Sequence, residues 1–108
     1  MKLTRLIEVL NAKARNLSDD RELQTGYAGD FLSFVMGKAP QDSAWFTVMN
    51  NINIMAVATL AEVGVIVVCE GVHVDETLLG RAQTQGINVI ETDYDIYSAI
   101  KIATREGL

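Results

Sequence analysis

The strongest feature of the hydrophobic pattern is an unbroken apolar run in the middle of the chain, from Val65 to Cys69. Most of its residues are β-branched, and glycine stands just before it at Gly64 and soon after it at Gly71. A strand with one face in water alternates apolar and polar residues, whereas an unbroken run is typical of a strand covered on both faces. We therefore expect a central strand with helices packed on either side of it.

Helical patterns lie on both sides of this run. Residues 3–10 are apolar at positions 3, 6, 7 and 10, which is the stripe of an amphipathic helix. Residues 52–63 are apolar at almost every position, so we expect a buried helix there, with Asn53 as its N-cap. A further helix is predicted between an N-cap at Asp75 and a glycine stop at Gly86.

Short runs rich in β-branched or aromatic residues separate the helical patterns and predict strands. They are residues 13–17, a weak run, and residues 44–49, 65–69 and 87–91. Residues 92–95 have the form of a capping box that opens at Thr92, ahead of a last helix. Strand and helix alternate from about residue 23 onward, which is the βα signature of a mainly parallel sheet. The predicted fold class is α/β, in a single domain over residues 1–108.

Residues 26–30 form a predicted loop with two glycines, and the helix that follows is apolar on more than one side. The residues that can face the core are Leu32, Val35 and Met36. Phe31 and Phe34 add apolar surface on other sides, so this helix either lies deep inside the domain or meets another chain. In so small a domain we expect a homodimer with Phe31 and Phe34 at its interface.

Composition narrows the classes of function. The chain has 108 residues, of which 49% are hydrophobic and 21% charged, as expected of one folded domain. No apolar stretch is long enough to span a membrane, and the N-terminal residues have no signal-peptide pattern. The single cysteine, Cys69, excludes an internal disulfide and indicates the cytoplasm. The net charge of −5 disfavours nucleic acid and anionic membranes as partners.

Charge is also unevenly distributed along the chain, because five of the nine basic residues lie before residue 22. A solvated surface explains this pattern best. A basic docking face for an acidic protein partner is the alternative.

Polar residues cluster where the predicted strands end, and ligands of parallel sheets bind at such ends. Each of these loops leads into a helix, so its backbone N–H groups can point at an anion. The candidate ligand-binding residues are Gly26, Tyr27, Gly29, Asp30, Asn50, Asn51, Asn53, Glu70, Gly71 and Thr92, with Asp93 beside them. This predicted rim is polar, mildly acidic, and contains no lysine or arginine.

Several kinds of site are excluded or disfavoured. Gly37-Lys38 lacks the upstream glycine and the hydroxyl residue of a phosphate-binding P-loop. One histidine and one cysteine cannot make a zinc site, and we expect no cofactor. Asp30, Glu70 and Asp93 could converge on a magnesium ion, although helix capping and solvation explain them better.

Three segments carry a resemblance to the small stand-alone DRTGG-domain proteins of anaerobic bacteria, which are related to the N-terminal domain of HPr kinase/phosphorylase. They are Gly26-Tyr27-Ala28-Gly29-Asp30-Phe31-Leu32-Ser33, Ala44-Trp45-Phe46-Thr47-Val48 and Asn53-Ile54-Met55-Ala56-Val57-Ala58. The resemblance implies a three-layer α/β/α domain akin to the N-terminal domains of that kinase and of the MurF-type ligases. It also implies a regulatory or ligand-sensing role. Kinase chemistry belongs to a separate P-loop domain, so it is not implied for this chain.

The namesake residues of that family are mostly missing here. The Asp-Arg pair should fall where Asn50-Asn51-Ile52-Asn53 stands, and the Thr-Gly-Gly should follow the central strand, where Cys69-Glu70-Gly71 stands. Losing the arginine removes an evident clamp for an anion.

Three functional hypotheses remain. The first is a non-catalytic regulatory module that binds a nucleotide or a phosphorylated small molecule at the strand-end loops. The second is a protein-interaction module, a homodimer or a docking domain, with no small ligand. The third, a metal-assisted enzyme using Asp30, Glu70 or Asp93, has the least support because no nucleophile and base pair is visible.

Overall fold

The central apolar run forms the middle strand of a five-stranded sheet in the computed structural model, which describes all 108 residues. The strands are β1 (Lys13–Asn16), β2 (Thr25–Ala28), β3 (Ser43–Thr47), β4 (Val65–Val68) and β5 (Val89–Glu91). Their order across the sheet is β1-β5-β4-β3-β2. β2, β3, β4 and β5 are parallel to one another, whereas β1 runs antiparallel to β5. The prediction of a mainly parallel sheet is confirmed.

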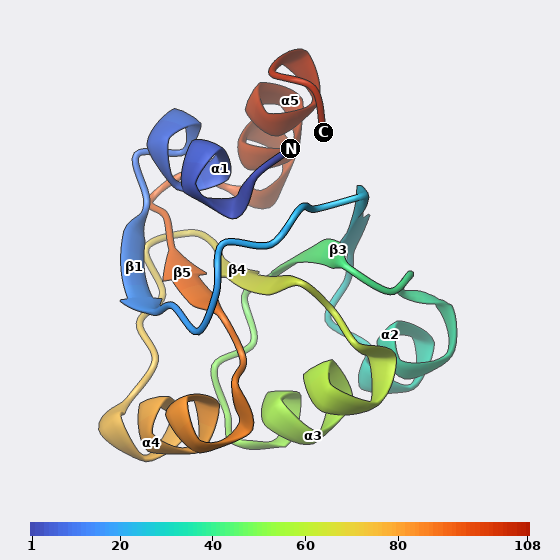
Figure 1. Ribbon diagram of the computed structural model, residues 1–108, viewed down its shortest axis with the longest axis vertical. Coiled ribbons are helices and arrows are strands. Elements are labelled where there is room, and N and C mark those ends of the chain that lie inside the picture. Colours follow the sequence, from blue (N-terminus) through green and yellow to red (C-terminus); the bar gives the residue numbers. More distant parts are fainter.

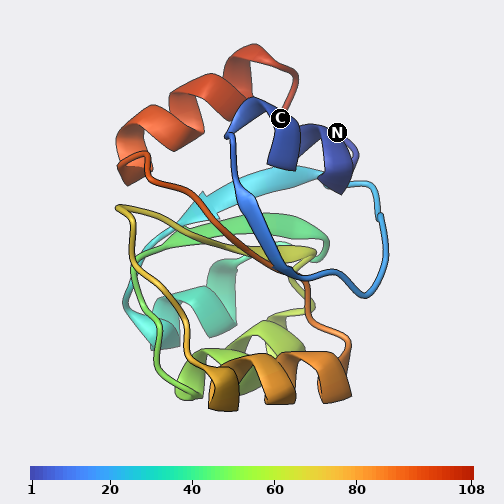
Figure 2. The same cartoon turned by 90° about the vertical axis from the view of Figure 1, so that its left-hand side faces the viewer.

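Five helices cover the two faces of this sheet. They are α1 (Leu3–Val9), α2 (Leu32–Lys38), α3 (Asn53–Ala61), α4 (Glu76–Gln85) and α5 (Ile96–Arg105). Figure 2 shows α1 and α5 on one face and α2, α3 and α4 on the other. The result is the three-layer α/β/α arrangement that we expected. No helix has the length and apolar character needed to span a membrane.

β4 explains why both layers of helices are needed. All four of its residues are completely buried, as an unbroken Val/Ile run predicts. Because side chains alternate along a strand, Ile66 and Val68 join the apolar cluster under α2, α3 and α4, and Val65 and Val67 join the cluster under α1 and α5. Figure 1 shows β4 between these layers.

Two predicted helix ends are confirmed. The Asp75 carboxylate accepts a hydrogen bond from the Leu78 amide at 2.9 Å, which makes it the N-cap of α4. Gly86 ends α4 with a φ of 72°, a left-handed conformation that glycine adopts without strain.

Two other predicted caps are wrong. Asp95, and not Thr92, caps α5 by accepting the Ser98 amide. The chain bends at Asp93 and Tyr94, so the helix begins only at Ile96. Asn53 is the first residue of α3, and Asn51 accepts the Asn53 amide instead. Local sequence allowed several polar residues to cap these helices, and the exact start of each helix decided which one does.

The structure also corrects the predicted loop at residues 26–30. Gly26, Tyr27 and Ala28 belong to β2 because they pair with Ala44, Trp45 and Phe46 of β3. Glycine is poorly suited to strands in isolation, and this pairing overrides its local preference.

Burial of two side chains was also predicted wrongly. Met36 is 46% exposed instead of facing the core, and Leu60 in α3 is 66% exposed although that helix was predicted to be buried all round. Both helices lie in an outer layer, so one side of each meets solvent.

Candidate functional site

The carboxyl ends of the four parallel strands lie along one edge of the sheet, and the antiparallel strand β1 starts at that same edge. Lys13, the first residue of β1, is the register partner of Glu91, the last residue of β5. A polar cavity of about 210 Å³ opens there. Its lining residues are Asn11, Lys13, His73, Glu91 and Asp93. We call this cavity the edge pocket.

Glu91 is the buried centre of the edge pocket, with a side chain only 4% exposed. One carboxylate oxygen, Oε2, accepts hydrogen bonds from Arg15 at 2.7 Å and from the Val74 amide at 2.8 Å. The other, Oε1, lies 2.9 Å from Nδ1 of His73. Burial opposes the ionisation of Glu91, but the hydrogen bonds from His73, Val74 and Arg15 outweigh it and hold the pKa of the carboxyl below its ordinary value. The pocket therefore contains a fixed carboxylate whose charge is already balanced by Arg15.

Lys13 gives the edge pocket a cation that was not expected from the sequence. The rim was predicted to contain no lysine or arginine, and that prediction is wrong because β1 runs antiparallel and returns Lys13 to this edge. Unlike Arg15, Lys13 is exposed and makes no ion pair with a carboxylate. Lys13 is thus free to meet an anion from outside.

The loop after β4 and the loop after β5 are joined by hydrogen bonds. Glu70 and Gly71 occupy a tight turn with φ values of 65° and 71°, closed by a bond from the Val72 amide to the Cys69 carbonyl. Their own amides donate to Tyr94 and Thr92, at 2.8 and 3.1 Å respectively. The two loops consequently form one hydrogen-bonded wall beside the edge pocket.

Most of the other predicted site residues hold this edge together. The Asp30 carboxylate accepts the Thr47 hydroxyl at 2.5 Å and the Val48 amide at 3.0 Å, which ties the end of β2 to the end of β3. The Asn50 side chain donates to the carbonyl of His73 at 2.9 Å. Thr92 is buried, and its hydroxyl donates to the Leu10 carbonyl. These polar groups are used internally, so the structure brings them to the predicted edge but leaves them little capacity for a ligand.

Gly26 and Tyr27 lie away from that edge. They sit within β2, beside a second cavity of about 280 Å³ on the α5 side of the sheet. Gly29 stays at the end of β2, where its carbonyl accepts the indole N–H of Trp45 at 2.9 Å. The predicted set of residues is therefore divided between two places.

The candidate magnesium ligands do not come together. No three histidine, cysteine, aspartate or glutamate side chains are grouped closely enough to hold a metal ion. Asp30 is held by Thr47, as described above, and Asp93 lines the edge pocket. The alternative of a magnesium site at Asp30, Glu70 and Asp93, already disfavoured from the sequence, is wrong. Cys69 is buried too, and burial together with the nearby Glu70 charge raises the pKa of its thiol to about 12.

Four residues of the edge pocket were missed as site residues: Asn11, Lys13, His73 and Glu91. The sequence predicts Glu91 only as the end of a strand. The pairing of β1 with β5 brings Asn11 and Lys13 to Glu91 across more than 70 positions of sequence, and His73 reaches Glu91 by its own contact. A charged residue at the end of a strand that is otherwise buried was the one available signal for Glu91.

A protein-family model described as the DRTGG domain matches residues 6–105, which is nearly the whole chain. The chain belongs to the DRTGG domain family. This confirms the resemblance drawn from the sequence, whereas its relation to HPr kinase/phosphorylase stays a prediction. No curated protein sequence matches this DRTGG domain.

A solved structure has the same fold: that of the CBS and DRTGG domains of the regulatory region of Clostridium perfringens pyrophosphatase, complexed with its activator diadenosine tetraphosphate. The TM-score is 0.74 at 17% sequence identity. The match covers 93% of this chain but only 44% of the pyrophosphatase chain, so the DRTGG domain described here spans less than half of that regulatory region. At this identity the likeness establishes the fold.

The two segments where the namesake residues of the family were expected follow neighbouring strands. Asn50 to Asn53 comes after β3, and Cys69 to Gly71 comes after β4. Both lie at the same edge of the sheet as the edge pocket, on the side nearer to β2.

Proposed function

We propose that this DRTGG domain is a non-catalytic regulatory module that binds a nucleotide or a phosphorylated small molecule at the edge pocket. The observation that carries the proposal is the unpaired Lys13 beside a polar cavity at the strand ends, in a domain of a regulatory family. The regulatory region of the pyrophosphatase, which shares this fold, binds a dinucleotide activator. The single buried thiol of Cys69 fits a reducing cytoplasm as the place where the module works.

The charges and size of the edge pocket suit part of such a ligand. Lys13 would hold a phosphate, since Arg15 is already engaged by Glu91. Asp93 and Asn11 offer groups that hydrogen-bond to a ribose or a base. Binding pockets usually measure roughly 300–1,000 Å³, so a cavity of about 210 Å³ would take one end of a nucleotide. The rest would lie across the wall formed by Glu70, Gly71 and their neighbours.

A thermal-shift screen tests this proposal. Diadenosine tetraphosphate, ATP, AMP and a sugar phosphate should be compared with sodium chloride of equal ionic strength. A ligand at ten times its Kd stabilises the folded state by about 1.4 kcal/mol, which in a domain of this size raises the Tm by about 6–10 °C. Lys13→Ala should abolish the shift. Lys38→Ala, at the last residue of α2 and outside the edge pocket, should keep it. If no compound shifts the Tm, or if Lys13→Ala responds like the parent chain, the proposal fails.

A second function is supported by one specific observation, an exposed aromatic pair at the start of α2. Phe31 and Phe34 are 62% and 53% exposed, and their rings meet edge to face at 4.8 Å. Lys38 Nζ lies 4.7 Å from the Phe34 ring centre. Clustered aromatic side chains that are exposed to solvent are typical of protein interfaces. We propose that this pair forms a homodimer contact, or failing that a docking site for another protein.

Light scattering tests the dimer. The chain has a mass of 11.8 kDa, so a homodimer should give twice that value. The double substitution Phe31→Ser and Phe34→Ser should return the mass to that of one chain, whereas Tyr97→Ser, at an even more exposed aromatic residue on α5, should not. A single-chain mass for the parent at high concentration would contradict the homodimer.

A further inference from the structure

The two outer strands of the sheet differ in how they are protected. β1 carries Lys13 and Arg15 in only four residues, and its pairing with β5 is interrupted by a register shift between Ala14 and Asn16. Charges and bulges of this kind prevent another strand from pairing with an exposed edge. β2, at the other edge, has no charge, no proline and no register shift in its pairing with β3. One edge of the sheet is closed to further pairing and the other is open.

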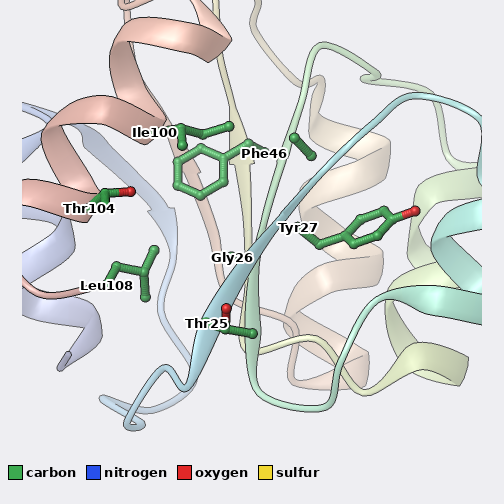
Figure 3. Close-up of a pocket in the computed structure, with 8 residues that line it drawn as sticks. Thr25, Gly26, Tyr27, Phe46, Ile100, Thr104 and Leu108 are labelled. Carbon is green, nitrogen blue, oxygen red and sulfur yellow. The ribbon is translucent and has the colours of Figure 1, made fainter.

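The open edge lies directly beside the larger cavity of the molecule, which we call the β2 groove. Its volume is about 280 Å³. It is lined by all four residues of β2 together with Phe46, Ile100, Thr104 and Leu108. Figure 3 shows the Tyr27 ring pointing away from Phe46, Ile100 and Leu108, so this residue borders the groove with its main chain. The groove thus runs along the backbone of the edge strand.

The groove exists because β2 presents almost no side chain on this face. Gly26 has none, and a Cβ added there would lie 3.2 Å from the Phe46 ring and 3.6 Å from Leu108. Gly26 and Ala28 are both exposed, while Thr25 and Tyr27 are partly covered. A glycine in the interior of a strand often marks a place where another backbone or a ligand approaches closely.

We propose that β2 is a docking site for an extended segment of another protein, which adds a sixth strand to the sheet and inserts an apolar side chain into the β2 groove. In this mode of recognition, main-chain hydrogen bonds along the edge give affinity, and pockets for alternate side chains give specificity. An exposed neutral edge and a cavity beside it are the two parts that the mode requires.

The volume of the groove selects the occupant. A cavity of about 150 Å³ accepts a benzene molecule, so about 280 Å³ has room for one aromatic side chain or for two aliphatic ones at alternate positions of a strand. A second copy of this chain that paired antiparallel through its own β2, with each face of the sheet continuous, would offer only Gly26 and Ala28 on this face and would leave the groove empty. The partner segment is therefore one with large apolar residues at alternating positions and no net negative charge, given the −5 charge of the domain.

The test uses a synthetic peptide and the whole chain. A capped peptide of about eight residues, enough for one strand, alternates leucine with threonine and has a lysine at each end. A control peptide of the same length has proline in place of the central threonine, which removes a backbone N–H donor. Binding is followed by NMR shifts of the domain amides and by their hydrogen exchange.

We expect the alternating peptide to slow the exchange of the β2 amides by about tenfold or more and to shift the resonances of Phe46 and Ile100, while β1 is unaffected. Thr104→Lys places a charge in the groove and should weaken binding at least about tenfold. Thr84→Lys, at another exposed threonine, on α4, should leave binding unchanged. The proline peptide should not bind.

Three results would overturn the proposal. The first is no protection of the β2 amides at about 1 mM peptide. The second is equal binding to the Thr104→Lys and Thr84→Lys variants. The third is protection of the same amides without peptide when the mass in solution is that of two chains, which would assign the open edge to a second copy.

Discussion

Ser43 and Thr47 stand at the two ends of β3, and replacing each hydroxyl should change stability in opposite directions. Both residues are completely buried. The Ser43 hydroxyl has no hydrogen-bond partner, and it is the one buried side-chain oxygen in the protein of which this is true. The Thr47 hydroxyl donates to Asp30 at 2.5 Å and accepts the Met49 amide at 3.1 Å.

The expected magnitudes follow from these contacts. A buried polar group without a partner costs about 1–3 kcal/mol, so Ser43→Ala should stabilise the fold by about 1 kcal/mol. The backbone bonds of Ser43, to Gly64 and Pro40, are kept in that variant. Thr47→Val keeps the volume but removes a hydrogen bond to a charged carboxylate, worth about 1.5–3 kcal/mol, so it should destabilise the fold by about 2 kcal/mol.

Urea unfolding measures both effects. With an m-value of about 1–3 kcal/mol/M, Ser43→Ala should raise the midpoint by about 0.5 M and Thr47→Val should lower it by roughly twice as much, at unchanged m. A midpoint for Ser43→Ala that is lower than that of the parent chain would refute the reasoning, because it would show that the hydroxyl has a partner in solution, such as a buried water molecule.

Two further predictions concern the turn and the buried carboxylate. Gly71→Ala places a side chain at a φ of 71° and should lower the free energy of unfolding in urea by about 1 kcal/mol. Gly37→Ala, where an added Cβ on α2 meets nothing within 4 Å, should not lower it. Equal losses in the two variants would contradict the strain argument. Hydrogen bonds from Arg21 and Asn88 lower the pKa of Asp19 from 3.8 to about 2, and the pKa of Glu91 is also below its ordinary 4.5. The unfolded chain therefore binds these protons first, so stability should be constant above about pH 5 and fall as the pH drops toward 2. Glu91→Gln should make this loss of stability at low pH smaller. A parent chain whose urea midpoint is constant down to pH 3 would contradict the predicted pH dependence.

Sequence patterns were sufficient for the elements with strong local signals. The run from Val65 to Cys69 is unbroken and β-branched, so few arrangements other than a central strand could bury it. Asp75 and Gly86 cap the two ends of α4 through local chemistry, and both caps were predicted correctly. The prediction of a loop in place of β2 was wrong because the pairing partner of β2, the strand β3, lies outside any window of local sequence.

The candidate site was harder to predict because its residues come from both ends of the chain. Lys13 and Asp93 line one pocket only because β1 pairs antiparallel with β5. Nothing in the weak apolar pattern of residues 13–17 indicates the direction of that strand. The predicted polar residues at the strand ends did reach one edge, yet Asp30 and Thr92 hydrogen-bond within the protein instead of facing solvent.

The positions of α1 and α5 have a consequence for how such a domain can be combined with others. The two ends of the chain lie close together in both views of the molecule (Figures 1 and 2). Met1 and Leu108 pack against the same apolar cluster, and Arg5 pairs with Glu106 at 3.2 Å. A domain whose ends meet can be inserted into a surface loop of a host protein without stretching either junction. Force or motion arriving through those junctions would reach α1 and α5 first, on the face opposite α2, α3 and α4.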